Sequence, residues 1–262
     1  MHAALSISVI THKTVLMQQI QNWARVGFHW FHSGVVSADA AVSWARKADR
    51  YYAVSLDRNQ RARAKALGEG RAIMLMHEIE GSGELWWILM VTPPNRTHPA
   101  HRLEPLKNAF DGASRIQLTG YELCHVTKRG SSAPVLTWRM TAAAYEARRE
   151  EILDTVRRGG PREHRRLIVS LWRSPGFFGI RQQVGHCVAL LRSEFRRRRP
   201  SQTLLRLPDK LYYLSRLKVV SVPLTVWLAA QAARVPHALP HDNHDGSSSG
   251  VREGNSIKMR GR

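Results

Sequence analysis

The chain has 262 residues, 43% of them hydrophobic, which is enough to bury the core of one large domain or of two small ones. Forty Lys and Arg against twenty Asp and Glu give a formal net charge of +20, and because such a charge repels itself we expect a polyanionic partner: nucleic acid, an anionic membrane surface or an acidic protein. Only two cysteines are present, Cys124 and Cys187, which excludes a disulfide scaffold or a zinc ribbon and indicates a reduced, cytoplasmic setting.

The first segment, residues 1–70, is predicted to be largely helical. Its N-terminal MHAALSISVITHK has no basic stretch before a long apolar run, so no signal peptide is expected. Apolar spacing predicts a helix over 12–26, and GFHWFHSG then breaks it and suggests a short strand. A second helix is expected to begin at a cap formed by Ser37, and a third to begin after Asp57 and end at Gly68.

Residues 71–140 change to β-rich segments. AIMLMHEI and LWWILMVT are joined by EGSGE, and YELCHVT and VLTWRM by KRGSSA, which predicts two hairpins. HRLEPLKNAF, between the hairpins, predicts a short amphipathic helix. The sequence therefore predicts an α+β fold with a central, largely antiparallel sheet, and a ferredoxin-like or RRM-like layout is one member of that class.

Residues 141–200 predict three helices, 142–158, 162–173 and 179–199, separated by Gly and Pro. This segment carries 14 basic residues, all of them Arg, against 6 acidic ones. The planar guanidinium suits bidentate phosphate contacts better than the lysine ammonium does. Three helices joined by short turns could form a unit of the helix-turn-helix kind, whose last helix enters the major groove of DNA.

The last of these helices is predicted to carry a basic stripe beside its apolar one. At 100° per residue, four arginines fall within an arc of about 60°. They are Arg181, Arg192, Arg196 and Arg199. Arginines near a helix C-terminus also offset the helix dipole, which is the alternative interpretation. Three further basic faces favour phosphate binding over capping: Arg162, Arg165 and Arg166; Arg58, Arg61 and Lys65; and Arg46, Lys47 and Arg50.

Beyond Pro200 the helical pattern weakens. Residues 201–235 are mixed in character and are expected to pack back on the body of the protein. Their apolar run VVSVPLTVWLAA is about a dozen residues long, against the roughly 20 that cross a bilayer, so no membrane partner is expected. Residues 236–262 lack any apolar period and predict a disordered tail.

Thirteen histidines raise the question of an enzyme. No H-E-x-x-H motif is present, so neither a metal site nor a cofactor is expected. A metal-independent ribonuclease would need a histidine as general base and an arginine to stabilise the pentavalent phosphorane. His29 and His32, close to Arg25 at the end of the first predicted helix, are the candidates for that base. A structural role for each histidine is the alternative.

The succession WWILMVT, HP, GYEL, LTWRMT and GFFGIRQQV resembles segments of uncharacterised proteins that bacterial conjugative plasmids and integrative elements carry, over residues 12–220. The resemblance implies a mobile-element setting in a bacterium and carries over no site residues. In layout, small antiparallel sheets combined with basic helices also resemble CRISPR repeat-processing ribonucleases. The glycine-rich loop near the C-terminus of those enzymes is absent here, because GFFG is too short.

We therefore expect a nucleic-acid-binding protein of a mobile element that acts in regulation, replication or transfer and is not itself catalytic. The stripe arginines are the expected phosphate contacts, whether the partner is DNA or RNA. An RNA-processing endoribonuclease and an interaction protein for an acidic partner are the two alternatives.

Overall fold

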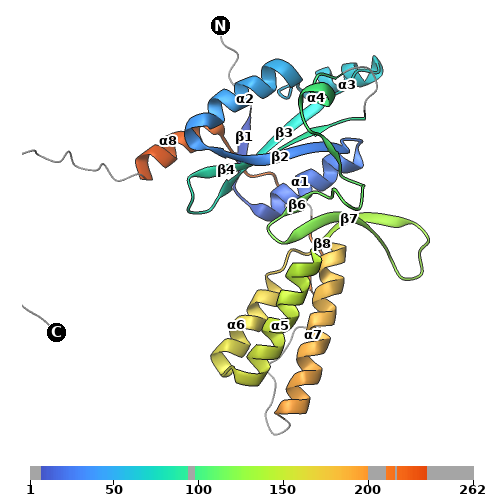
Figure 1. Ribbon diagram of the computed structural model, residues 1–262, viewed down its shortest axis with the longest axis vertical. Helices are drawn as coiled ribbons and strands as arrows, with labels where there is room; N and C mark the ends of the chain where they lie inside the picture. Colours follow the sequence, from blue (N-terminus) through green and yellow to red (C-terminus); the bar gives the residue numbers. More distant parts are fainter. Residues whose placement is uncertain (1–6, 94–97, 200–210, 216, 235–262) are drawn as a thin grey trace, which may run out of the picture.

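The computed structural model describes residues 7–93, 98–199, 211–215 and 217–234. These residues form an α+β protein, as predicted. A six-stranded sheet with helices on both faces makes up one end of the molecule, and a bundle of three helices extends from it (Figure 1). A second, three-stranded sheet lies between these two parts.

The larger sheet is mixed. Its strands are β1 (Ser8–Ile10), β2 (Trp30–Ser37), β3 (Ala72–Ile79), β4 (Glu84–Val91), β5 (Lys107–Asn108) and β9 (Ser221–Pro223), in the spatial order β5-β2-β4-β3-β1-β9. Antiparallel pairing is confirmed for β2, β4 and β3, but β1 runs parallel to β3. The order of the elements also differs from the β-α-β-β-α-β succession of a ferredoxin-like fold.

Both faces of this sheet are buried, each in its own hydrophobic core. Alternate residues of each strand point to opposite faces and so belong to different cores. Ile73, Ile88 and Met90 belong to one core, together with the apolar face of α1 (Lys13–Arg25). The residues between them in β3 and β4 belong to a second core, under α2 (Ala38–Tyr52) and α8 (Leu224–Arg234). The near-continuous apolar character of AIMLMHEI and LWWILMVT follows from this two-sided burial.

The two predicted hairpins are confirmed, but they belong to different sheets. The second hairpin forms the smaller sheet, whose strands are β6 (Gln117–Leu118), β7 (Tyr121–Thr127) and β8 (Pro134–Met140). The prediction of one helix over HRLEPLKNAF is wrong. Only α4 (Ala100–Leu103) is helical there, and the chain then extends to form β5 against β2.

The helices of the first segment are confirmed within a residue or two. The third, α3 (Arg58–Ala66), begins with a capping box in which Asp57 accepts from the Gln60 backbone N–H and the Gln60 side chain accepts from the Asp57 N–H. Gly68 follows the helix end with a φ of +70°.

The three predicted basic helices are confirmed as α5 (Ala142–Arg158), α6 (Pro161–Trp172) and α7 (Phe178–Arg198). The start of α7 packs on β8, where Trp138 is fully buried and its indole N–H donates to the Met17 carbonyl at 2.8 Å. This hydrogen bond joins β8 to α1, and one hydrophobic core runs from α1 through β8 into the bundle.

The described part of the C-terminal segment packs back on the body, as expected. The Leu214 N–H donates to the Gly176 carbonyl at 3.1 Å, and the two ends of the Gln18 amide bond the backbone of Ser215 and Leu217. Further on, β9 adds an edge strand to β1, and α8 covers it. The predicted tail, 236–262, lies outside the described residues.

Candidate nucleic-acid interface

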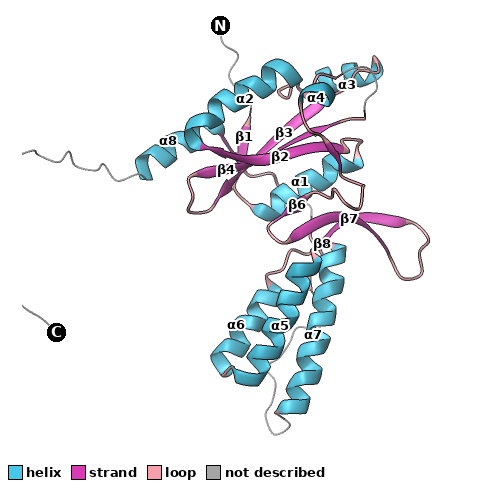
Figure 2. Ribbon diagram, in the orientation of Figure 1, coloured by secondary structure: helices cyan, strands magenta, loops and turns pink. Residues whose placement is uncertain are grey.

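The free end of the helical bundle brings together three helix termini. Because α7 begins at β8, its C-terminus lies far from the sheets, beside the turn that joins α5 to α6 (Figure 2). The guanidinium of Arg199 confirms this arrangement, since it donates to the carbonyls of Val156 and Gly159 at 3.1 and 2.8 Å. The C-termini of α5 and α7 and the N-terminus of α6 therefore meet at one place.

This end is strongly basic, and we refer to its arginines as the distal cluster. The members come from the last turns of α5, the first turns of α6 and the last turns of α7. They are Arg157, Arg158, Arg162, Arg165, Arg166, Arg192, Arg196, Arg197, Arg198 and Arg199. The same turns contain three carboxylates: Asp154, Glu163 and Glu194.

The three carboxylates neutralise only part of the distal cluster. Asp154 lies 3.3 Å from Arg158, and Glu194 lies 2.5 Å from Arg197 and 3.7 Å from Arg198. The hydrogen bond from Arg197 lowers the pKa of Glu194. The Glu163 side chain accepts from the Gly160 backbone N–H at 2.9 Å.

The remaining arginines of the distal cluster, apart from Arg199, form no ion pair or hydrogen bond with another described residue. Most of them are also exposed to solvent. These six are Arg157, Arg162, Arg165, Arg166, Arg192 and Arg196. Their charges are therefore available to an anion that approaches the end of the bundle.

The predicted four-arginine stripe of α7 does not form one surface. Arg181 lies near the sheets, about 22 Å along the helix from Arg196 at about 1.5 Å per residue. Its guanidinium stacks 3.4 Å above the Tyr213 ring and donates to the Leu211 carbonyl at 2.8 Å. Arg199 bonds the last carbonyls of α5. Of the four stripe arginines, only Arg192 and Arg196 belong to the distal cluster and form no ion pair or hydrogen bond with another described residue.

The predicted basic face of α3 lies at the opposite end of the molecule from the distal cluster (Figure 1). Arg58 and Lys65 are exposed there. Arg61 instead donates to the Leu56 carbonyl and lies 5.3 Å from the centre of the Trp23 ring. These cations cannot contact the same short stretch of nucleic acid as the bundle end.

The two candidate catalytic histidines lie on opposite faces of the larger sheet. His29 packs against the Phe110 ring at 4.3 Å, and burial lowers its pKa. His32 lies on the other face, with its Nδ1 3.0 Å from Glu104 and its ring against Trp87. No hydrogen bond within the described chain joins either ring to an arginine. The structure does not bring the pair together as one acid–base site.

A wide groove of about 1020 Å³ runs past the N-terminus of α1 and holds other titratable side chains, among them Lys13. The His77 Nδ1 lies 2.6 Å from the Ile10 carbonyl, and Glu78 accepts from the Trp227 indole at 2.9 Å. Both groups are thus engaged by the fold itself. Over the described residues, no group of three or more His, Cys, Asp or Glu could hold a metal ion.

None of the helices that the structure describes is long and apolar enough to cross a membrane. Comparison of the chain with family models, with curated proteins and with solved structures gives no match.

The sequence predicted Arg162, Arg165, Arg166, Arg192 and Arg196 of the distal cluster as phosphate contacts but did not point to the end of α5. Arg157 and Arg158 follow its last apolar residue as a doublet, directly before Gly159 and Gly160. A basic doublet before such a turn, facing a second basic helix end, is the signal that would have found them. Recognising this signal requires the knowledge that the C-terminus of α7 lies beside the end of α5.

Proposed function

We propose that this protein binds nucleic acid through the distal cluster and is not itself catalytic. One observation carries the proposal: six arginines that form no ion pair or hydrogen bond with another described residue are concentrated at one end of a packed bundle. Concentrating like charges costs stability unless an anion offsets it. A polyanion with regularly spaced phosphates is the partner that several guanidinium groups can contact at once.

The geometry favours phosphate contacts over reading of base edges. A recognition helix must expose one side along several turns to enter the major groove. In α7 the apolar side packs against α5 and β8, Arg181 is held by Tyr213, and the free arginines gather at the helix end. Backbone contacts of this kind position a protein without specifying sequence. We infer binding with little dependence on base sequence.

The setting we propose, an accessory function in the regulation, replication or transfer of a bacterial mobile element, depends on the resemblance of GYEL, LTWRMT and GFFGIRQQV to segments of proteins from such elements. Binding that tolerates any sequence suits an accessory protein that coats or bridges nucleic acid during transfer. The setting is a separate proposal from the binding surface.

The test is a salt titration of binding to duplex DNA and to hairpin RNA. A variant with Arg162, Arg165, Arg166 and Arg196 changed to Ala removes four exposed cations of the distal cluster. On duplex DNA we expect the slope of log K against log salt to become shallower by about 0.9 for each lost phosphate contact. An unchanged slope contradicts the assignment.

The matched control removes the same charge from the opposite end of the molecule. Arg46, Arg50, Arg58 and Lys65 are exposed on α2 and α3, and changing these four to Ala leaves the distal cluster intact. We expect this variant to retain most of the wild-type slope. An equal loss in both variants would show that net charge alone drives binding, and the distal cluster would lose its role.

A further inference from the structure

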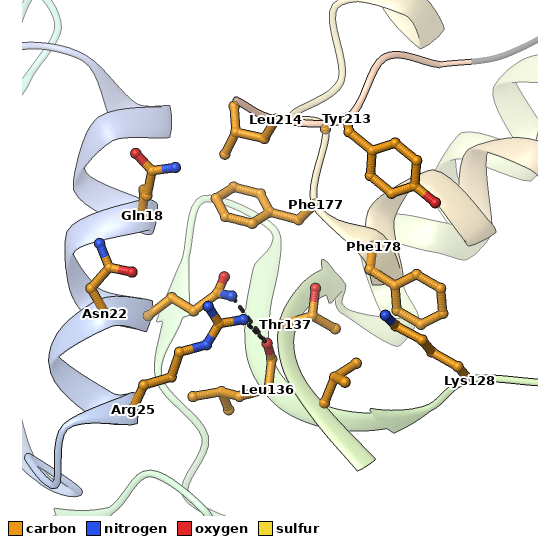
Figure 3. Close-up of a pocket in the computed structure, with 13 residues that line it drawn as sticks. Gln18, Asn22, Arg25, Lys128, Leu136, Thr137, Phe177, Phe178, Tyr213 and Leu214 are labelled. Carbon is orange, nitrogen blue, oxygen red and sulfur yellow. Dashed lines mark hydrogen bonds between the residues drawn. The ribbon is translucent and has the colours of Figure 1, made fainter. Parts of the chain in front are cut away.

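A pocket of about 250 Å³ lies where the bundle meets the rest of the protein. Five segments line it: α1, the β7–β8 loop, β8, the turn between α6 and α7 together with the first residue of α7, and residues 213–214. Figure 3 shows Gln18, Asn22 and Arg25 of α1 on one side and Phe177, Phe178 and Tyr213 on the other. The pocket is far from the distal cluster and uses none of its residues.

The pocket is cationic. Arg25 and Lys128 line it, and none of the described residues around it carries a carboxylate. Arg25 donates to the Leu136 carbonyl at 3.3 Å, which holds its guanidinium at the edge of the pocket. Lys128 extends from the β7–β8 loop, with its Nζ 5.4 Å from the centre of the Phe178 ring. Figure 3 shows Arg25 on the α1 side of the pocket and Lys128 beside Phe178 on the other side.

Gln21 supplies an unused acceptor at the same place. Its side chain lines the pocket and only 7% of the residue is exposed. The amide nitrogen donates to the Leu136 carbonyl at 3.0 Å, and this fixes which end of the amide is the oxygen. The Oε1 atom has no hydrogen-bond partner among the described residues. Because buried acceptors are rarely left unpaired, this atom is able to accept a hydrogen bond from an N–H or O–H donor that enters the pocket.

The opposite wall is aromatic. Phe177 is buried, whereas Tyr213 is 73% exposed and has the Arg181 guanidinium stacked at 3.4 Å from its ring centre. Phe178 completes this wall beside Lys128. Exposed aromatic rings and guanidinium planes are surfaces on which unpaired nucleic-acid bases stack.

We propose that this pocket binds a single nucleotide unit. The base stacks on Phe178 and Tyr213 and donates a hydrogen bond to the Oε1 of Gln21, while the phosphate contacts Arg25 and Lys128 at the mouth. A volume of 250 Å³ is below the roughly 300–1,000 Å³ of pockets that enclose a whole drug-sized ligand, which agrees with one ring inside and the charge outside. The unit comes either from a free nucleotide or from an unpaired residue of the strand that the distal cluster binds, and in the second case the inference depends on the proposed function.

The experiment measures binding of adenosine, guanosine, cytidine and uridine 5′-monophosphates to the full chain by calorimetry, with ribose 5-phosphate as the probe that lacks a base. We expect saturable binding of at least one nucleotide and weaker binding of ribose 5-phosphate. Ribose 5-phosphate binding as tightly as every nucleotide, or no nucleotide binding at millimolar concentration, overturns the proposal.

Variants assign the binding to the pocket. Lys128→Ala removes an exposed cation, and we expect the nucleotide Kd to rise about tenfold, as for loss of a charge-assisted hydrogen bond. Arg129→Ala, at the next residue and outside the pocket lining, is the matched control and should leave Kd unchanged. Gln21→Met tests the role of the unpaired oxygen. Because Gln21 is buried, this substitution affects packing, and if the variant does not fold, the result for Lys128→Ala decides the outcome. Equal effects of the two loop variants overturn the assignment.

A duplex with a single-stranded overhang separates the two sources of the nucleotide and the two proposals. If the unit belongs to a strand, Lys128→Ala weakens binding of the overhang substrate and leaves the blunt duplex unaffected. If the unit is free, it weakens mononucleotide binding alone. The distal-cluster variant should lose the blunt duplex but keep the mononucleotide. If the wild-type protein binds no mononucleotide but its duplex binding depends on the distal cluster, the pocket proposal alone is overturned. If it binds mononucleotides through Lys128 but its duplex binding does not depend on the distal cluster, the proposed function alone is overturned.

Discussion

Individual arginines of this protein differ in what their guanidinium groups contact. Arg115 and Arg139 lie 2.8 and 2.6 Å from Glu122, a carboxylate that is only 7% exposed. Arg61 lies on Trp23, and Arg199 bonds the end of α5. Such side chains stabilise the fold through these contacts. Breaking an ion pair to a buried carboxylate, for example, would leave an uncompensated buried charge and destabilise the protein. The formal charge of +20 therefore overstates the charge that a partner can contact.

The two thiols are expected to be unreactive in the native protein. Burial raises the pKa of Cys187 to about 11 and also raises the pKa of Cys124. At pH 8 both groups are thus thiols, and the thiolate is the reactive form. Iodoacetamide followed by mass spectrometry should show no adduct on the native protein and two on the unfolded protein. Rapid modification of native Cys187 would mean that α7 does not pack against α5 as described.

At the scale of the elements, α7 fixes how the bundle joins the sheets. Its first turn lies so close to β8 that a Cβ built on Gly179 would be 2.6 Å from the Trp138 carbonyl oxygen. That oxygen is backbone and cannot move aside as a flexible side chain would. Glycine at this position is what lets α7 start against β8 and direct its C-terminus to the distal cluster.

Two glycines of α7 provide a matched pair of substitutions. Gly179→Ala should destabilise the protein because of the contact with β8. Gly185→Ala places its Cβ where no atom lies within 4 Å, and it should stabilise by about 0.5–1 kcal/mol because alanine is the better helix former. Urea unfolding followed by circular dichroism measures both free energies of unfolding. The same sign of change in the two variants would contradict this account of the junction.

At the scale of the whole molecule, the exposed cations of the described residues include two distant groups, one at the end of the bundle and one on the exposed faces of α2 and α3. Figure 1 places these at opposite ends of the long axis. A distance of this kind allows one end to bind a polyanion while the other remains in solvent. It also predicts that the two four-residue variants described above behave differently, although both lower the net charge by the same amount.

Stability of the whole fold should fall on mild acidification. Burial lowers the pKa of His29, His98 and His164 from the ordinary value of 6.5. As the pH falls below 6.5 the unfolded chain takes up protons that the folded chain does not, so the free energy of unfolding decreases. Urea midpoints at pH 7.5 and pH 5.5 measure this loss. Equal midpoints would show that these rings are not buried as neutral groups.

One histidine can be tested separately. His164 is 5% exposed, lies against the Phe195 ring and has Arg199 close by, which also lowers its pKa. His164→Phe should reduce the difference between the two urea midpoints. His186→Gln, at an exposed position of α7, is the matched substitution and should preserve the difference.

The amino-acid sequence by itself determined most of the elements. Helices α1, α2, α3, α5, α6 and α7 and both hairpins follow from apolar spacing, from caps such as Asp57 and from Gly and Pro breaks, all of which act between near neighbours in the chain. The arginine-rich character of residues 141–200 was equally visible. It did not require any knowledge of how the helices pack.

Only the tertiary structure decided how these elements combine. The parallel pairing of β1 with β3 and the addition of β9 to β1 join residues that are far apart in the sequence, and no local pattern specifies such contacts. The same holds for the distal cluster, which needs α7 to return beside α5, and for the pocket, which needs five segments at once. Arg181 and Arg199 lie on the predicted stripe, yet Tyr213 and the end of α5 bind them, because contacts between distant segments, not helical periodicity, determine which guanidinium groups stay free.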